Sequence, residues 1–177
     1  MIEERIAKRY AKSMYDLAAE RKETDAVLND CQMMQNAFDD SRELVLFLKN
    51  PILSSERKIG LFRKIFGGKV TKQMETLIES LARRHRGLLL PWIVKEFIAS
   101  FNKSHNQTPV EIVSAIDLDP NLIQKIVEKI ETQLRTKALV KQTVDTSLIG
   151  GLRILMDDKL YDGSIATALR KIEKQFK

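Results

Sequence analysis

The sequence is poor in the features that mark secreted, membrane-spanning and base-stacking proteins. Its 177 residues contain one cysteine, Cys31, so no intrachain disulfide can form. The apolar stretch at 44–48 is far shorter than the roughly 20 residues that span a bilayer. The N-terminus has no apolar signal-peptide core, and aromatic residues make up only 6% of the chain, which leaves few rings for stacking bases. These absences predict a cytoplasmic protein.

Residues that commonly carry enzyme chemistry are scarce or isolated. Cys31 lies in an apparently helical segment beside Met33 and Met34, which predicts a small buried hydrophobe rather than a reactive thiol. His85 lies among arginines and His105 in a polar break, and neither has a nearby cysteine or histidine with which to bind a metal. We therefore expect no catalytic residue, metal, cofactor or small-molecule ligand.

Positive charge is concentrated in the first part of the chain. The net charge is +6, with 19 Lys and Arg against 14 Asp and Glu in residues 1–105, and 11 against 10 in residues 106–177. Such an excess suits an acidic partner, an anionic membrane surface, nucleic acid or simply a solvated helix face. The clustered basic residues are Arg57, Lys58, Arg63, Lys64, Lys69, Lys72, Arg83, Arg84 and Arg86.

Helical periodicity dominates the first 105 residues. Apolar residues recur at helical spacing in six segments, near 3–21, 24–38, 41–48, 54–66, 71–81 and 91–103. The candidate N-caps are Thr24, Ser41, Ser54 or Ser55, and Thr71. Six helices with short connections predict a compact all-α domain over residues 1–105.

The first of these helices has an unusually wide apolar face. One stripe is formed by Ile6, Tyr10, Met14 and Leu17, and the adjoining stripe by Ala7, Ala11, Tyr15 and Ala18. Together they cover about half of the circumference, more than the roughly 100° that one core requires. Two interpretations fit: the alanine stripe receives a helix of another protein, or the helix is buried in the middle of its own bundle.

The pattern changes after a polar break that ends in Pro109. Val110 and Ile112 alternate with polar residues as in a strand, and a helix is predicted from Pro120, capped by Asp119, to about residue 136. A second strand is predicted at 139–144. Residues 106–177 are therefore expected to form a small α+β domain.

The stretch at 144–165 has the pattern of a β-hairpin that leads into a last helix. Two adjacent glycines, 150 and 151, permit a bulge or a close backbone approach. Alternating apolar residues at 152, 154 and 156 predict a strand, and Asp157 with Asp158 predicts the turn to a short second strand. Asp162 or Ser164 is the candidate N-cap of the last helix.

Two motifs resemble the delta subunit family of F-type ATP synthases, whose mitochondrial member is the oligomycin-sensitivity conferring protein. One is IAKRYAKSMYDLA at residues 6–18, and the other is VDTSLIGGLRILMDDKLYDGSI at residues 144–165. The second matches the C-terminal signature of the family in its acids, its pair of small residues and its final DGS. The corresponding residues are Asp145, Gly150, Gly151, Asp158, Asp162, Gly163 and Ser164.

The resemblance implies a mainly α protein with an N-terminal six-helix bundle, residues 1–105, followed by a small α+β domain with a β-hairpin, residues 106–177. It also implies a non-catalytic stator that links the catalytic head to the b subunits of the peripheral stalk and resists torque during proton-driven ATP synthesis. The implied location is the cytoplasmic face of the bacterial inner membrane, with membrane association only through the complex.

In this family the N-terminal domain receives the N-terminal helix of an alpha subunit between its first and fifth helices, and the C-terminal domain holds the b subunits. No nucleic acid partner is implied. Carried onto this chain, the resemblance implies that the groove is formed by Tyr10, Ala11, Met14, Ala18, Leu77, Ser80, Leu81 and Arg84.

Two alternatives come from other classes of protein. A basic nucleic-acid-binding module would use Arg57, Lys58, Lys64 and the run at 83–86, although aromatic residues are scarce. A hydrolase could use paired carboxylates for acid–base chemistry, although acids are also common in turns. Its candidate carboxylates are Asp145, Asp157, Asp158 and Asp162.

Overall fold

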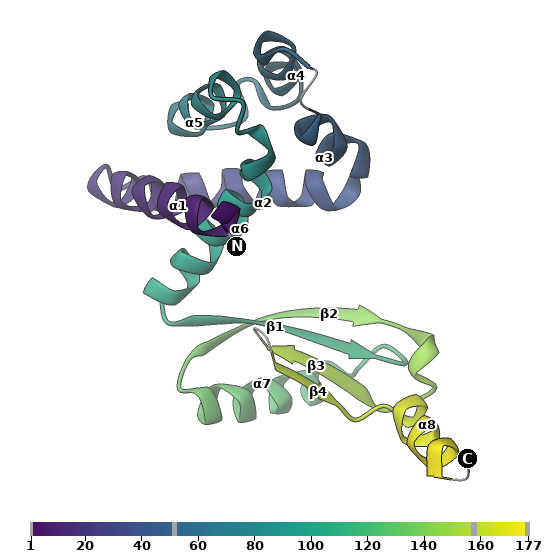
Figure 1. The fold of residues 1–177 in the computed structure, drawn as a ribbon. Coiled ribbons are helices and arrows are strands. Elements are labelled where there is room, and N and C mark those ends of the chain that lie inside the picture. The colour runs from purple at the N-terminus through teal and green to yellow at the C-terminus, as the bar shows by residue number, and fades with distance from the viewer. Residues whose placement is uncertain (1, 51–52, 157–158, 176–177) are drawn as a thin grey trace. The chain divides into compact units, whose positions relative to one another are not determined.

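The computed structural model describes residues 2–50, 53–156 and 159–175. The chain divides into two units, Met1–Phe101 and Asn102–Lys177. Figure 1 shows helices throughout the first unit and a sheet with helices in the second. The prediction of a mainly α protein with a small sheet that includes a hairpin is confirmed. The predicted turn at Asp157 and Asp158 lies outside the described residues.

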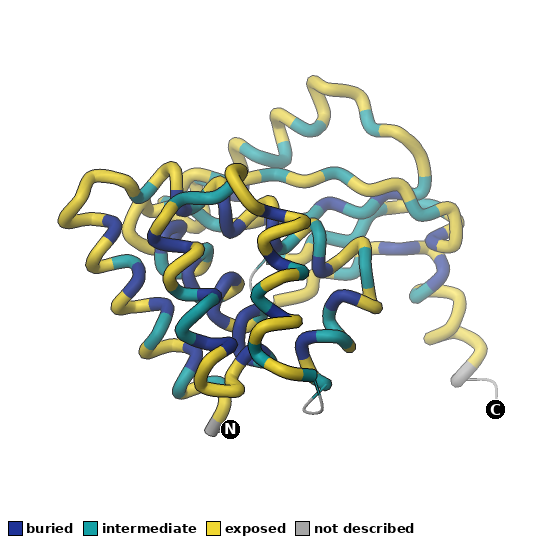
Figure 2. The backbone as a smooth tube through the Cα atoms, turned by 90° about the horizontal axis from the view of Figure 1, so that it is seen from above, coloured by how far each residue is buried: buried dark blue, intermediate teal, exposed yellow. Residues whose placement is uncertain are grey.

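The helices of the first unit are joined by short connections. They are α1 (Ile2–Glu20), α2 (Thr24–Asp40), α3 (Arg42–Lys49), α4 (Ser55–Phe66), α5 (Lys72–Arg83), the short 3₁₀ helix η1 (Gly87–Leu89) and α6 (Leu90–Ser104). Buried and exposed positions alternate along them, as Figure 2 shows. This alternation is the amphipathic pattern that places one face of each helix against a common core.

Side-chain caps begin three of these helices. Ser41, Ser54 and Thr71 each accept a hydrogen bond from the backbone N–H three residues further on, as predicted. The predicted cap at Thr24 is wrong, because Thr24 is already inside α2 and the preceding Glu23 is its N-cap without a side-chain bond. The N–H of Glu23 bonds back to the end of α1, so the second helix starts directly from the turn that closes the first.

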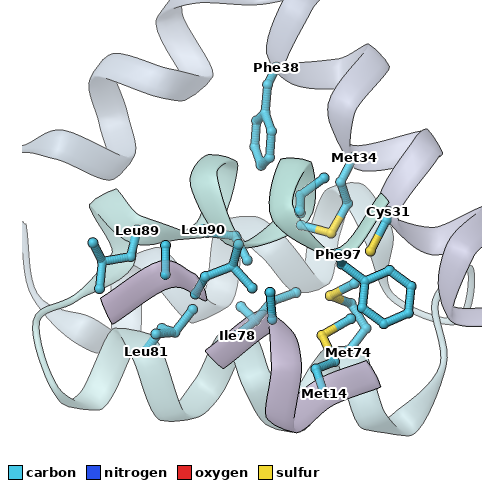
Figure 3. Packing of buried hydrophobic residues seen from close by; sticks show 14 of the residues in the cluster. Met14, Cys31, Met34, Phe38, Met74, Ile78, Leu81, Leu89, Leu90 and Phe97 are labelled. Atoms are coloured by element: carbon cyan, nitrogen blue, oxygen red, sulfur yellow. The ribbon is translucent and has the colours of Figure 1, made fainter. Parts of the chain in front are cut away.

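Sulfur-containing and aromatic side chains join aliphatic ones in the core of the first unit. Phe97, Met34 and Met74 are fully buried, and the ring of Tyr15 lies 5.7 Å from that of Phe97. Figure 3 shows Met34, Met74 and Phe97 meeting from different helices. The core therefore joins distant parts of the sequence and not only neighbouring helices.

The single cysteine belongs to this core. Cys31 is 0% exposed, which confirms the prediction of a small buried hydrophobe. Burial raises the pKa of its thiol, and the neighbouring Asp30 raises it further. The thiol is therefore protonated at neutral pH and unsuited to nucleophilic chemistry.

The alanine stripe of α1 is covered by the chain itself. Ala7, Ala11 and Ala18 are 0%, 1% and 0% exposed. Small side chains let α1 approach closely, and α1 contacts α2 and η1. The interpretation that this stripe receives a foreign helix is wrong, and the alternative of a helix buried in its own bundle is correct for this face.

The second unit is a sheet with one long crossover helix. Its elements are β1 (Gln107–Ser114), α7 (Pro120–Leu134), β2 (Lys137–Val144), the short 3₁₀ helix η2 (Thr146–Leu148), β3 (Leu152–Met156), β4 (Lys159–Asp162) and α8 (Ile165–Gln175). The strand order is β2-β1-β3-β4. The β1–β2 pair is parallel, with α7 connecting the two strands, whereas β3 pairs antiparallel with both β1 and β4.

A small core lies between the sheet and α7. Val110 and Ile112 of β1 are 1% and 0% exposed, and they pack with Ile130 of α7. Ile154 of β3 lies on this face, directly opposite Ile112. On the other face Leu155 remains 38% exposed, so the predicted alternation along this strand is confirmed.

No helix in the described ranges is long and apolar enough to cross a membrane.

Replacing Ala11 by leucine should destabilise the first unit, because the added atoms have no room inside a close helix contact. We expect a loss of about 1–3 kcal/mol in the free energy of unfolding. Ala19→Leu is the matched control, because Ala19 is exposed on the same helix. Thermal and urea unfolding measure both variants. Equal stability of the two would contradict the buried position of Ala11.

Candidate functional site

A groove lies between α1 and α5 in the first unit. We call it the α1–α5 groove. It has a volume of about 330 Å³. Its lining residues are Tyr10, Ser13, Met14, Leu17, Arg21, Lys72, Gln73, Thr76, Leu77 and Ser80. The α1 contributors recur at spacings of three and four residues, so they lie on one face of the helix.

A buried glutamine ties the two walls of the groove together. Gln73 is 8% exposed, and its Nε2 donates to the backbone oxygen of Met14 over 2.8 Å. Its Oε1 is buried and has no hydrogen-bond partner within the described residues. In the turn that follows the other end of α5, Arg86 Nη1 donates to the hydroxyl of Tyr10 over 3.3 Å. The two helices therefore run in opposite directions along the groove.

Four of the eight residues that the family resemblance placed in the groove line it. These are Tyr10, Met14, Leu77 and Ser80. The other four do not: Arg84 lines two neighbouring concavities, and the rest, Ala11, Ala18 and Leu81, are at most 1% exposed. The side chains of Ala11, Ala18 and Leu81 pack inward and do not line this groove.

Sequence reasoning missed several groove residues. Ser13 and Thr76 are polar, and nothing in an apolar pattern singles them out. Leu17 was recognised as part of the first stripe of α1 but was not assigned to the groove, and it is 37% exposed. The sequence feature that indicates the groove is the stripe of larger side chains through Tyr10, Met14 and Leu17. The alanine stripe beside it faces the core instead.

The acids and glycines of the motif at 144–165 hold a set of tight turns in the second unit. The N–H of Asp145 donates to the backbone oxygen of Ser114 over 2.8 Å, which joins the end of β2 to that of β1. Asp145 Oδ1 accepts from the N–H of Ser147 over 2.9 Å and so begins η2. The hydrogen bonds from Ser147 lower the pKa of this carboxyl group.

The two glycines after η2 allow this loop to lie against the start of α8. A Cβ at position 150 would lie 2.6 Å from Cδ1 of Ile165, and a Cβ at position 151 would overlap the backbone oxygen of Gly163. Gly151 also has a φ of +75°, which other residues rarely adopt. The close approach is fixed by the bond from the N–H of Ile165 to the backbone oxygen of Gly150, 3.0 Å long.

Asp162 is the centre of the turn between β4 and α8. Its Oδ1 accepts from the N–H of Ser164 over 2.9 Å, and its Oδ2 accepts from Thr167 Oγ1 over 3.0 Å. Arg153 Nε lies 3.3 Å from the same Oδ2. The hydrogen bonds from Ser164, with smaller effects from Thr167 and Arg153, hold the pKa of Asp162 well below its usual range.

Ser164 is the N-cap of α8, since its Oγ accepts from the N–H of Thr167 over 3.3 Å. Both described acids of this motif are thus engaged in local turn bonds. Asp158 lies outside the described residues. This use of carboxylates favours a structural role for the motif over acid–base chemistry.

The basic residues proposed for nucleic acid binding are only partly available. Lys58 is 6% exposed, and its Nζ donates to the backbone oxygen of Leu48 over 3.1 Å, so it cannot contact a phosphate in this conformation. Arg83 forms an ion pair with Glu79. The nucleic-acid interpretation is therefore wrong for Lys58, which is buried and bonded inside the first unit.

Comparison with known proteins identifies the chain. The family model of the ATP synthase delta (OSCP) subunit matches residues 6–176. The chain belongs to this family. The delta subunit of Chloroherpeton thalassium is 29% identical over 168 residues, covering 95% of this chain and 92% of that protein. The delta subunit of Clostridium perfringens is 31% identical over 166 residues, covering 94% and 93%.

A solved structure supports the fold. A chain in the cryo-EM structure of the Toxoplasma gondii mitochondrial ATP synthase hexamer aligns with a TM-score of 0.72 and 21% identity, covering 96% of each chain. As a member of the delta subunit family, this protein is a non-catalytic subunit of F-type ATP synthase and a component of its peripheral stalk.

The ionised carboxylate of Asp162 makes the turn between β4 and α8 of this delta subunit sensitive to acid. Because folding lowers the pKa, the ionised carboxylate stabilises the folded unit above the unfolded pKa of about 3.9, and this contribution is lost as the pH falls towards the folded pKa. Asp162→Asn should reduce the hydrogen-exchange protection of the Ser164 and Thr167 amides at pH 7. The difference from the unmodified chain should shrink below about pH 4.

Asp117→Asn, a change of the same type at an exposed position, is the control and should leave both amides unaffected. The difference in hydrogen-exchange protection between Asp162→Asn and the unmodified chain should not grow on acidification. If it does, the lowered pKa of Asp162 is contradicted.

Proposed function

We propose that the α1–α5 groove receives an amphipathic helix from the N-terminal segment of an alpha subunit. The observation that carries this proposal is an elongated groove whose accessible apolar side chains lie at helical spacing. Tyr10, Leu17 and Leu77 are partly or well exposed along it, whereas Ala7, Ala11 and Ala18 on the adjoining stripe of α1 are buried. An amphipathic helix laid into a groove uses anchors at this spacing.

We propose further that α1 to α6 act as one six-helix bundle on the catalytic head, in the domain of residues 1–105. The domain of residues 106–177 would then hold the b subunits, and the protein would lie at the cytoplasmic face of the bacterial inner membrane through the complex alone. In this arrangement it links head to stalk and resists the torque that accompanies proton-driven synthesis.

An apolar stripe on α8 supports the b-subunit contact. Ile165, Leu169 and Ile172 are 47%, 51% and 51% exposed, and their spacing of four and three residues places them on one face. Apolar stripes on two helices can pack against each other as in a coiled coil, so this stripe suits a helical partner.

The energy of one such contact is modest. A helix that removes roughly 600 Å² of apolar surface gains about 15 kcal/mol before costs. Loss of translational and rotational freedom takes back roughly 4–15 kcal/mol. Two contacts in one assembly raise the effective concentration of each partner, so the link is durable although each contact alone is only moderately tight.

The groove proposal is tested with Leu17→Asp, which places a charge on the accessible wall without entering the core. Calorimetric titration with a peptide of the alpha-subunit N-terminus should show binding that is weaker by ten-fold or more, since at least 1.4 kcal/mol of apolar contact is lost. Leu46→Asp is the control, because Leu46 is exposed on α3 outside the groove. Equal affinity of the two variants would place the peptide elsewhere.

The b-subunit proposal is tested with Leu169→Ala. Pull-down of the b subunits by the full-length chain should fall, because an exposed anchor of the α8 stripe is removed. Arg170→Ala is the control, because Arg170 is exposed on the same helix but does not belong to the apolar stripe. Undiminished recovery with Leu169→Ala would show that the b subunits use another surface.

A further inference from the structure

The α1–α5 groove adjoins a second concavity at its Tyr10 end. We call it the arginine basin; its volume is about 410 Å³. Its lining residues are Ile6, Arg9, Tyr10, Ser13, Arg84 and Arg86. Tyr10 and Ser13 line both the basin and the groove, so a segment lying in the groove can extend into the basin.

The positive charge of the basin is not neutralised by the described part of the chain. No carboxylate lines it, and none of its three arginines forms an ion pair with a described residue. By contrast, the nearby Arg63 and Arg83 both lie against Glu79. Like charges gathered without a counter-charge repel each other, and an anionic partner would relieve that repulsion.

The C-terminal end of α5 accounts for only part of this cluster. A helix C-terminus carries a partial charge of about −0.5, which is smaller than the charge of three guanidinium groups. The end of α5 is itself well fixed. His85 adopts a φ of +55°, and the N–H of Arg86 donates to the backbone oxygen of Leu81 over 2.8 Å. This capping turn holds the backbone of Arg84 and Arg86 beside α1.

We propose that the segment bound in the α1–α5 groove carries one or more carboxylates at one end, and that the arginine basin binds them and so fixes the direction and register of that segment. This inference rests on the proposed function of the groove. The ligand is a protein segment rather than a free anion, because the basin adjoins apolar walls at Met14, Leu17 and Leu77. Guanidinium groups bind carboxylates through two parallel hydrogen bonds, which gives geometric selectivity.

The opposite end of the groove is less strongly charged. It is lined by Arg21 and Lys72, two cations against the three of the basin. Lysine also acts as a point charge and does not offer the paired donors of a guanidinium group. The end of the segment that carries the acid is therefore expected at Tyr10, beside the C-terminus of α5.

Calorimetric titration of the full-length chain with the alpha-subunit N-terminal peptide tests the inference. The double variant Arg84→Gln with Arg86→Gln should bind about ten- to a hundred-fold more weakly, because hydrogen bonds to charged groups are lost. Its affinity should also depend less on salt than that of the unmodified chain. The control is Arg5→Gln with Lys12→Gln, which removes the same charge from exposed positions of α1 outside the basin.

A second peptide, with every Asp and Glu replaced by Asn and Gln, completes a double-mutant cycle. It should bind the unmodified chain and the basin variant equally. If the basin variant unfolds, Arg9→Gln is used in its place, since the Arg9 side chain makes no bond to another described residue.

Unchanged affinity of the basin variant for the acidic peptide would overturn the inference. If Leu17→Asp still weakens binding by ten-fold or more in that case, the groove proposal stands and only the role of the arginines fails. If neither change affects binding, or the peptide does not bind, the groove proposal itself fails and the basin inference fails with it.

Discussion

Close packing between α1 and the rest of the helical unit is the contact on which the groove depends. Ala7, Ala11 and Ala18 end at Cβ, so they bring the helix near its neighbours and commit one face of it to the core. The larger side chains on the adjoining stripe then turn towards α5. The bond from Gln73 to the Met14 backbone fixes the spacing of the two helices at that point.

The second unit depends on a different kind of constraint. Its hydrophobic core is small, with Val110, Ile112 and Ile130 at the centre, and its chain reversals are held by backbone and carboxylate hydrogen bonds. Gly150 and Gly151 bring the loop before β3 against the start of α8, where a Cβ at position 151 would overlap the backbone of Gly163. Sequence similarity in this stretch therefore reflects requirements of backbone geometry more than of chemistry.

Much of the fold follows from local patterns. Helical spacing, three caps and the strand alternation are encoded within a few residues, so the sequence predicts them. The buried state of Ala11 and Lys58 does not follow, because it depends on which distant element covers each face. Alanine on a helix fits either a close internal contact or a surface for a partner, and only the three-dimensional arrangement separates the two.

The sequence indicated which two helices form the candidate site, but not all of the residues that line it. The family resemblance selected α1 and α5, and Tyr10, Met14, Leu77 and Ser80 do line the groove between them. Ser13 and Thr76 were not predicted, since polar residues on a helix leave no signal in an apolar pattern. The arginine basin also escaped prediction, because its parts come from the start of α1 and from the turn after α5.

The buried position of Cys31 has a practical consequence. A thiol that is enclosed in the core and held protonated does not react with maleimides or disulfide reagents while the protein remains folded. A cysteine introduced at an exposed site would then be the single reactive thiol of the chain. Fluorescent probes and cross-linkers could be attached at chosen points along either unit without first removing the native residue.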